Sequence, residues 1–211
     1  MIKLTKGGAP TVLQENAAAW TAQLLELISQ GPGSKKDADQ LKSRYRNEQV
    51  KKALLLETFE KCAYCESKFR HVTYGDIEHM IPKNPDPQLT FDWGNLTIAC
   101  DVCNTKKGEC VVIDPYVDRP EERLLFFGAA AMAVPGDQMA EFTLRKLDLN
   151  RAELLDRRTQ RLEHLKALRV VIANAQPGLM DMLEADFCRE LEDASEYAAL
   201  SRSFHRFVSN M

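Results

Sequence analysis

The chain has 211 residues, of which 45% are hydrophobic and 28% are charged, and its formal net charge is −3 at pH 7. This composition is that of an ordinary globular protein, and the length suffices for one domain wrapped by helical segments. No apolar stretch approaches the roughly 20 residues of a membrane span, and the first residues do not resemble a signal peptide, so we expect a cytoplasmic protein without membrane partners.

The first part of the chain is predicted to be a short strand followed by helices. Residues 2–6 read as a strand. Apolar residues then recur at helical spacing from Leu13 to Ile28, and the glycines and proline at 31–33 end this helix. A second helical region is expected from Ser34 to Phe59, with a break near residues 46–47.

Two stretches are locally basic although the whole chain is acidic. Residues 35–52 contain seven basic and three acidic side chains, and residues 151–169 contain six basic and three acidic ones. From residue 181 onward, seven acidic side chains outnumber three basic ones. The basic stretches either bind phosphate groups or are solvated helix faces, and the sequence leaves both readings open.

Four of the six cysteines form two pairs, Cys62-x-x-Cys65 and Cys100-x-x-Cys103. Each pair can direct two thiolates to one tetrahedral Zn²⁺, so the two pairs complete a closed structural site. The tight spacing favours thiolates on a metal in a reducing compartment over disulfides. Because a closed site leaves no position for water, any chemistry must lie beside the zinc.

An acid–histidine step, Glu78-His79, lies between the cysteine pairs at the end of a short β-like run. Asn95 falls in the loop before the second pair, and Asn104 follows the last cysteine, where a helix is expected to begin. Side chains of adjacent strand residues point to opposite faces. Glu78 and His79 can therefore meet at one site only if the strand ends or twists there.

The rest of the chain is predicted to be a hairpin followed by helices. Residues 124–147 read as a hairpin-like extension that turns at 134–137, although the alanine-rich run at 128–133 leaves a helix possible there. Leucines then recur at helical spacing from Leu154 to Leu168. Residues 176–178 separate this helix from further helices that reach Val208.

The runs "KCAYCE", "IEHMIPK" and "DWGNLTIACDVCNTKKGE" resemble HNH endonucleases braced by a four-cysteine zinc. Together with "IDPYVDRPEE" and "LDLNRAELLDRR", they resemble the PtuB-type HNH nucleases of Septu and retron anti-phage systems. The resemblance implies an α+β, mainly helical fold with a zinc-stapled ββα-metal core at residues 61–116. Residues 1–60 would form an N-terminal strand and helices, and residues 117–211 the hairpin-like extension and C-terminal helices.

The resemblance also implies roles for the central residues. His79 is expected to be the general base, because a neutral imidazole can take a proton from water near pH 7. Glu78 and Asn104 are expected to hold one catalytic Mg²⁺ or Mn²⁺ through oxygen atoms. Asn95 is expected to hold the loop that orients His79, by hydrogen bonds from its side chain to the backbone.

This chain departs from the commonest HNH pattern at two positions. Glu78 stands where an aspartate is usual, and Asn104 stands where a histidine is usual. An asparagine still offers a carbonyl oxygen to a metal, so the metal role survives. Three lysines are candidate contacts to substrate phosphates, and the last of them matches a lysine often found three residues after the final HNH position: Lys83, Lys106 and Lys107.

The function implied by the resemblance is a metal-dependent endonuclease that hydrolyses phosphodiester bonds. Its implied partners are a PtuA-type ATPase and, in some settings, a retron reverse transcriptase with its msDNA. One alternative is a zinc-stapled adaptor without catalysis, but an adaptor has no chemical need for Glu78, His79 and Asn104 together. A second alternative, a free-standing restriction-like nuclease, would fit a basic chain better than this acidic one.

Overall fold

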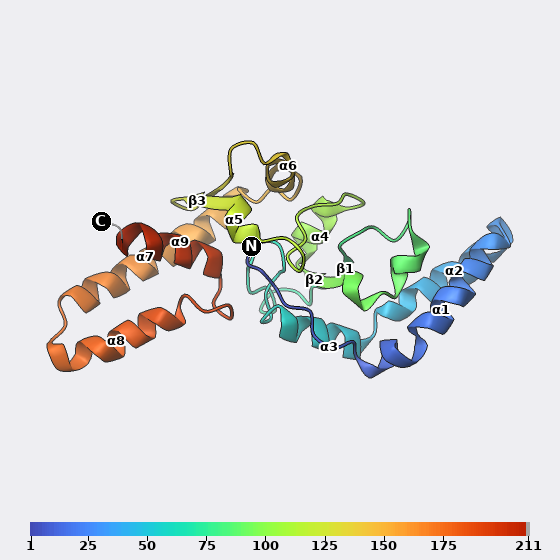
Figure 1. Ribbon diagram of the computed structural model, residues 1–211, viewed down its shortest axis with the longest axis horizontal. Helices are drawn as coiled ribbons and strands as arrows, with labels where there is room; N and C mark the ends of the chain where they lie inside the picture. The colour runs from blue at the N-terminus through green and yellow to red at the C-terminus, as the bar shows by residue number, and fades with distance from the viewer. Residues whose placement is uncertain (210–211) are drawn as a thin grey trace. The chain divides into compact units, whose positions relative to one another are not determined.

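A computed structural model describes residues 1–209, which divide into two compact units (Figure 1). One unit, here called the motif unit, comprises Leu4–Cys62 and Phe69–Val111. The other, here called the C-terminal unit, comprises Met1–Lys3, Ala63–Lys68 and the residues from Val112 onward. Residues 2–6 form no strand in the described chain, contrary to the sequence prediction, because no neighbouring strand pairs with them.

The motif unit begins with helices that lie beside one another. Helix α1 (Thr11–Ser29) packs on α2 (Lys35–Lys42), with a 3₁₀ turn, η1 (Pro32–Ser34), between them. A second 3₁₀ turn, η2 (Ser43–Tyr45), leads to α3 (Glu48–Glu57). The predicted break near residue 46 is confirmed: the Asn47 side chain accepts a hydrogen bond from the Gln49 amide at 2.8 Å and so caps α3.

The centre of the motif unit is an antiparallel strand pair followed by a helix. Strand β1 (Asp76–His79) pairs with β2 (Leu96–Ala99), so that His79 lies opposite Leu96. The loop between them contains the 3₁₀ turns η3 (Pro87–Thr90) and η4 (Trp93–Asn95). All four residues of β2 are buried; α3 packs on β2, and α4 (Asp101–Lys107) packs on β1. This strand–strand–helix arrangement confirms the expected fold class.

One glycine allows β1 to start where it does. Gly75 has a φ of +63°, and a Cβ atom there would overlap the ring of Phe69 and approach the carbonyl oxygen of Ala99 to 3.0 Å. Any other residue would be strained by the backbone conformation and blocked by these neighbours. Gly75 thus lets the chain turn tightly into the strand that carries the acid–histidine step.

The C-terminal unit contains a hairpin and several helices. Its elements, in chain order, are α5 (Pro120–Arg123), β3 (Leu124–Phe127), β4 (Ala130–Ala133), α6 (Gln138–Lys146), α7 (Ala152–Ala173), α8 (Pro177–Arg189) and α9 (Ala198–Ser209). Buried Leu165 and Ile172 of α7 pack with Phe187 of α8. In Figure 1 these two helices form a long hairpin.

The hairpin lies where the sequence indicates, but its turn does not. The strands β3 and β4 pair directly through a turn at Gly128, which has a φ of +59°. The predicted turn at residues 134–137 instead ends β4, and the Asp137 side chain accepts a hydrogen bond from the Ala140 amide at 2.9 Å. Asp137 thereby caps α6, so the segment expected to be the second strand is a helix.

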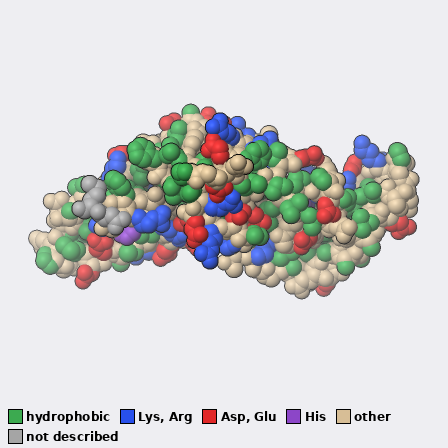
Figure 2. All heavy atoms as spheres, turned by 45° about the horizontal axis from the view of Figure 1, so that its top comes forward, with side chains coloured by type: hydrophobic (Ala, Val, Ile, Leu, Met, Phe, Trp, Pro, Cys, Tyr) green, Lys and Arg blue, Asp and Glu red, His purple; other side chains and the backbone are tan. Residues whose placement is uncertain are grey.

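Charges of both signs share the surface. Figure 2 shows lysine and arginine side chains interspersed with aspartate and glutamate side chains on the face drawn, as the net charge of −3 suggests. Within residues 1–209, no helix is both long enough and apolar enough to cross a bilayer.

Candidate active site

The four paired cysteines form a compact cluster. All four are buried, and their sulfur atoms lie within 4.8 Å of one another. Zn–S bonds of about 2.3 Å place the sulfurs of a tetrahedral site about 3.8 Å apart, which lies within this limit. Cys100 occupies the position just before α4, and Cys103 lies in the first turn of that helix. The predicted cluster is thus confirmed as a set of residues that could hold zinc.

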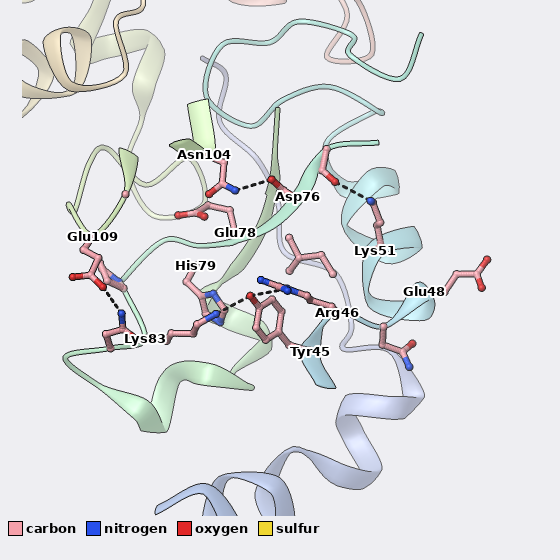
Figure 3. A pocket seen from close by; sticks show the side chains of 16 residues that line it. Tyr45, Arg46, Glu48, Lys51, Asp76, Glu78, His79, Lys83, Asn104 and Glu109 are labelled. Atoms are coloured by element: carbon pink, nitrogen blue, oxygen red, sulfur yellow. Dashed lines mark hydrogen bonds between the residues drawn. The ribbon is translucent and has the colours of Figure 1, made fainter. Parts of the chain in front are cut away.

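A cavity of about 560 Å³ in the motif unit brings Glu78, His79 and Asn104 together (Figure 3). Glu78 and His79 are neighbours on a strand, where side chains normally point to opposite faces. β1 ends at His79, and both Glu78 and His79 line the cavity. The strand thus ends at the acid–histidine step, which is the condition that the sequence analysis set for Glu78 and His79 to meet at one site.

His79 is a buried, neutral imidazole. Its Nε2 lies 3.0 Å from the carbonyl oxygen of Thr90. Because a carbonyl only accepts hydrogen bonds, Nε2 carries the proton and Nδ1 is left with the lone pair. Burial lowers the pKa of His79 to about 4, and nearby cationic side chains act in the same direction. At neutral pH the ring is therefore uncharged and keeps its lone pair on Nδ1.

Glu78 is paired with a lysine from α4. Lys107 Nζ lies 2.8 Å from Glu78 Oε1 and 2.7 Å from the carbonyl oxygen of His79. Burial raises the pKa of Glu78, and the Lys107 ammonium opposes this shift. A carboxylate has two oxygens with about four lone-pair sites. Pairing through Oε1 therefore does not preclude binding of a metal ion through Oε2.

Asp76 is a site residue that the sequence interpretation missed. Asn104 Nδ2 donates a hydrogen bond to Asp76 Oδ2 at 2.8 Å, and both residues line the cavity. Since the amide nitrogen of Asn104 is engaged in this way, its carbonyl oxygen is the atom that can bind a cation. The spacing Asp76-x-Glu78 was the available signal, because residues two apart on a strand share a face.

Asn95 holds the loop that follows His79. Its Nδ2 donates to the carbonyl oxygen of Ile81 at 2.8 Å, and its Oδ1 accepts from the Ile81 amide at 2.8 Å. The Asn95 carbonyl also accepts from the Met80 amide at 3.0 Å. The two bonds to Ile81 are of the side-chain-to-backbone kind expected for Asn95. The residue is buried and acts behind the site rather than inside it.

The three candidate lysines lie in different environments. Lys83 is half-buried and lines the cavity together with Arg46 and Lys51 from the basic stretch near α3. Lys106 is half-buried on α4 and is not among the residues that line the cavity. Lys107 is fully buried, so the expected phosphate contact from Lys107 does not fit its position. Its ammonium is directed inward because α4 packs against β1.

Residues 62–109 match the family model of the HNH endonuclease. The chain carries an HNH domain. The match spans both cysteine pairs, Glu78, His79 and Asn104, which are the residues that the structure brings into the cysteine cluster and the cavity.

Two curated proteins named PtuB are similar to this chain. The Septu protein PtuB of Bacillus thuringiensis is 33% identical over 112 residues, which are 50% of this chain and 43% of the relative. The Septu protein PtuB of Bacillus mycoides (strain KBAB4) is 26% identical over 188 residues, which are 70% of this chain and 64% of the relative. The resemblance to PtuB-type HNH endonucleases is confirmed. The chain spans less than two thirds of the length of either relative.

Proposed function

We propose that this chain is a metal-dependent endonuclease that hydrolyses phosphodiester bonds of nucleic acid. The observation that carries the proposal is the cavity in which a neutral His79 meets the oxygen-bearing side chains of Glu78 and Asn104. A neutral imidazole beside oxygen ligands for a divalent cation is what activation of water near a phosphate requires.

The residues of the cavity divide the reaction between them. Water attacks phosphorus, and the bond from phosphorus to the 3′ oxygen breaks. His79 Nδ1 accepts the proton that the attacking water loses. Mg²⁺ or Mn²⁺, when bound by Glu78 and Asn104, supplies positive charge to the phosphate and to the departing oxygen. Asp76 fixes the Asn104 amide so that its carbonyl oxygen is available as a ligand.

We further propose that the chain is the nuclease subunit of a cytoplasmic anti-phage defence complex with a PtuA-type ATPase. Support comes from both relatives, each named Septu protein PtuB. Neither name points to a retron, so the reverse transcriptase and msDNA are not part of the proposal. A reducing compartment suits four thiolates on zinc.

Charge also favours a partner. Residues 57–114 contain ten acidic side chains against six lysines and arginines. Zinc held by four thiolates would make this segment more negative still. Binding to duplex DNA normally draws on several released counterions. We therefore infer that the HNH domain needs another subunit to present its substrate.

Cleavage assays with the purified chain, alone and with a PtuA-type ATPase, test the proposed activity on DNA and RNA. His79→Ala should lower the rate by about 10²–10⁴-fold, the usual effect of removing a general base. His71→Ala is the matched control, because His71 is exposed and lies outside the cavity. Full activity in excess EDTA would argue against a catalytic cation. A complex that assembles but cuts no substrate would favour the alternative function, a zinc-stapled adaptor without catalysis.

A further inference from the structure

The side chain of Tyr45 joins two cationic side chains from distant parts of the sequence, beside His79 (Figure 3). Its hydroxyl oxygen lies 2.7 Å from Lys83 Nζ and 3.4 Å from Arg46 Nε. Its ring meets the His79 imidazole edge-on, with ring centroids 4.6 Å apart. Tyr45 is only 3% exposed, so its hydroxyl is a fixed point within the cavity.

Local structure holds both cations in place. Arg46 lies between η2 and α3, where its amide donates to the carbonyl oxygen of Ser43 at 2.9 Å and the next residue, Asn47, caps α3. Lys83 follows the buried Pro82 in the loop after His79. The two side chains therefore approach the Tyr45 hydroxyl from separate segments whose backbones are constrained.

The two cations have no ion-pair partner in the described part of the chain. Among residues 1–209, neither Arg46 nor Lys83 forms an ion pair with a carboxylate. By contrast, arginines such as Arg123 and Arg202 are paired with aspartates or glutamates. Two like charges near one hydroxyl repel each other, and an anion between them would relieve that repulsion.

Acidic side chains in the same cavity do not supply that anion. Four acidic residues line the cavity: Glu48, Asp76, Glu78 and Glu109. Three of them are hydrogen-bonded elsewhere, Asp76 to Asn104, Glu78 to Lys107 and Glu109 to Asn84. Lys83 helps to lower the pKa of Glu78, but none of the four carboxylates forms an ion pair with Arg46 or Lys83. Both cations lie close enough to His79 to help lower its pKa. The place of the missing anion is therefore within the cavity, next to His79.

We propose that Arg46 and Lys83, gathered by the Tyr45 hydroxyl, bind a phosphate group of the nucleic-acid backbone adjacent to the phosphate that is cleaved. The inference rests on the proposed function, because it assigns part of the substrate to the same cavity. A guanidinium can donate two parallel hydrogen bonds to phosphate oxygens, and an ammonium supplies a compact charge. Tyr45 is a positioning residue, since it acts through the two cations.

Binding measurements on a chain that cannot cut separate this inference from catalysis. In a His79→Ala background, a short fluorescein-labelled DNA duplex is titrated with the full chain, and with its complex if the ATPase copurifies, over a series of salt concentrations. The Arg46→Ala/Lys83→Ala double variant should reduce the slope of log K against log salt by about 0.9, the value for one lost phosphate contact, and each single alanine variant should reduce it by a part of that. The control is Lys36→Ala, which removes an exposed charge outside the cavity and should leave the slope unchanged.

Tyr45→Phe tests the positioning role without removing any charge. The ring remains against His79, and only the hydroxyl that meets Arg46 and Lys83 is lost. In a chain that retains His79, we expect KM to rise several-fold while kcat changes little. A fall in kcat at unchanged KM would assign Tyr45 to the support of His79 instead and would overturn its positioning role.

Other outcomes distinguish failure of the inference from failure of the proposed function. If both alanine variants keep the affinity and the salt slope of the parent, the proposed phosphate binding by Arg46 and Lys83 is wrong, even if the chain is an active nuclease. A reduced salt slope in the alanine variants, combined with no cleavage by the parental chain, would support phosphate binding by Arg46 and Lys83 and would reject the proposed nuclease function. If neither the chain nor its complex binds the duplex, the proposed phosphate binding is wrong for DNA. The same titration with RNA then decides between the two nucleic acids.

Discussion

The Lys107 ammonium contacts both the Glu78 carboxylate, at 2.8 Å from Oε1, and the main-chain carbonyl oxygen of His79, at 2.7 Å. One side chain of α4 thus fixes two consecutive residues at the end of β1. Lys107 is fully buried, and 12% of the Glu78 side chain is exposed. The pair therefore holds the strand end, where the proposed base lies, against the helix that carries Asn104.

Lys107→Met should destabilise the HNH domain markedly. Removing one partner of a buried ion pair leaves the other charge uncompensated, which typically costs about 3–5 kcal/mol. Urea unfolding monitored by circular dichroism measures the loss. Lys106→Met, at the half-buried neighbouring position, is the control and should cost less. Equal stability of the two variants would show that the Lys107–Glu78 pair does not hold the strand end.

Loss of the zinc should unfold the catalytic module rather than merely slow it. The binding energy of a four-thiolate site is folding energy, with apparent values of about 10–16 kcal/mol in finger peptides. Metal analysis should find about one zinc per chain. A Cys62→Ser/Cys100→Ser variant should lose both the metal and cooperative melting, whereas Cys110→Ser, outside the cluster, should keep both. A folded, zinc-free double variant of normal thermal stability would reject this role.

Asn104→Ala should raise the concentration of Mg²⁺ or Mn²⁺ needed for half-maximal cleavage, because it removes an oxygen ligand. Asp76→Asn should have a weaker effect in the same direction, since Asp76 orients the Asn104 amide by a 2.8 Å hydrogen bond. Metal titrations of cleavage rate measure both effects. If Asp76→Asn raises the metal concentration for half-maximal cleavage more than Asn104→Ala does, Asp76 itself is the more important metal ligand.

His79 should make the fold less stable as the pH falls. The folded-state pKa is about 4, below the ordinary value of about 6.5, so the unfolded chain binds the proton more readily. Stability from this residue is complete above pH 6.5 and declines as the pH falls towards 4, with a loss of about 2 kcal/mol between pH 7 and pH 5. Urea unfolding of the parent and of His79→Gln, compared at each pH, isolates this contribution. A difference that does not change with pH would contradict it.

The isolated chain should cut poorly and gain activity from its partner. The ten acidic side chains against six lysines and arginines in residues 57–114 limit binding of nucleic acid by the HNH domain itself. We expect copurification with a PtuA-type ATPase and a large increase in cleavage when that ATPase is added. Efficient, salt-sensitive cutting by the chain alone would contradict the requirement for a partner.

The sequence by itself determined several of the local elements and the ligand set of the cysteine cluster. Paired cysteines can meet at one metal only when their loops lie together, and the structure places all four sulfurs within 4.8 Å of one another. The helical periodicity of residues 11–29 and the break at residue 46 were equally readable, because they depend on neighbours in sequence. The position of His79 at a strand end was also predicted from the chain alone.

Only the tertiary structure decided which side chains meet. A lysine three residues after Asn104 reads as a phosphate contact, but the packing of α4 on β1 turns Lys107 inward to Glu78. The hydroxyl of Tyr45 meets Lys83, 38 residues away in sequence, and no local pattern encodes that contact. Periodicity specifies the face of an element on which a residue lies, whereas the group that this face meets depends on how distant elements pack.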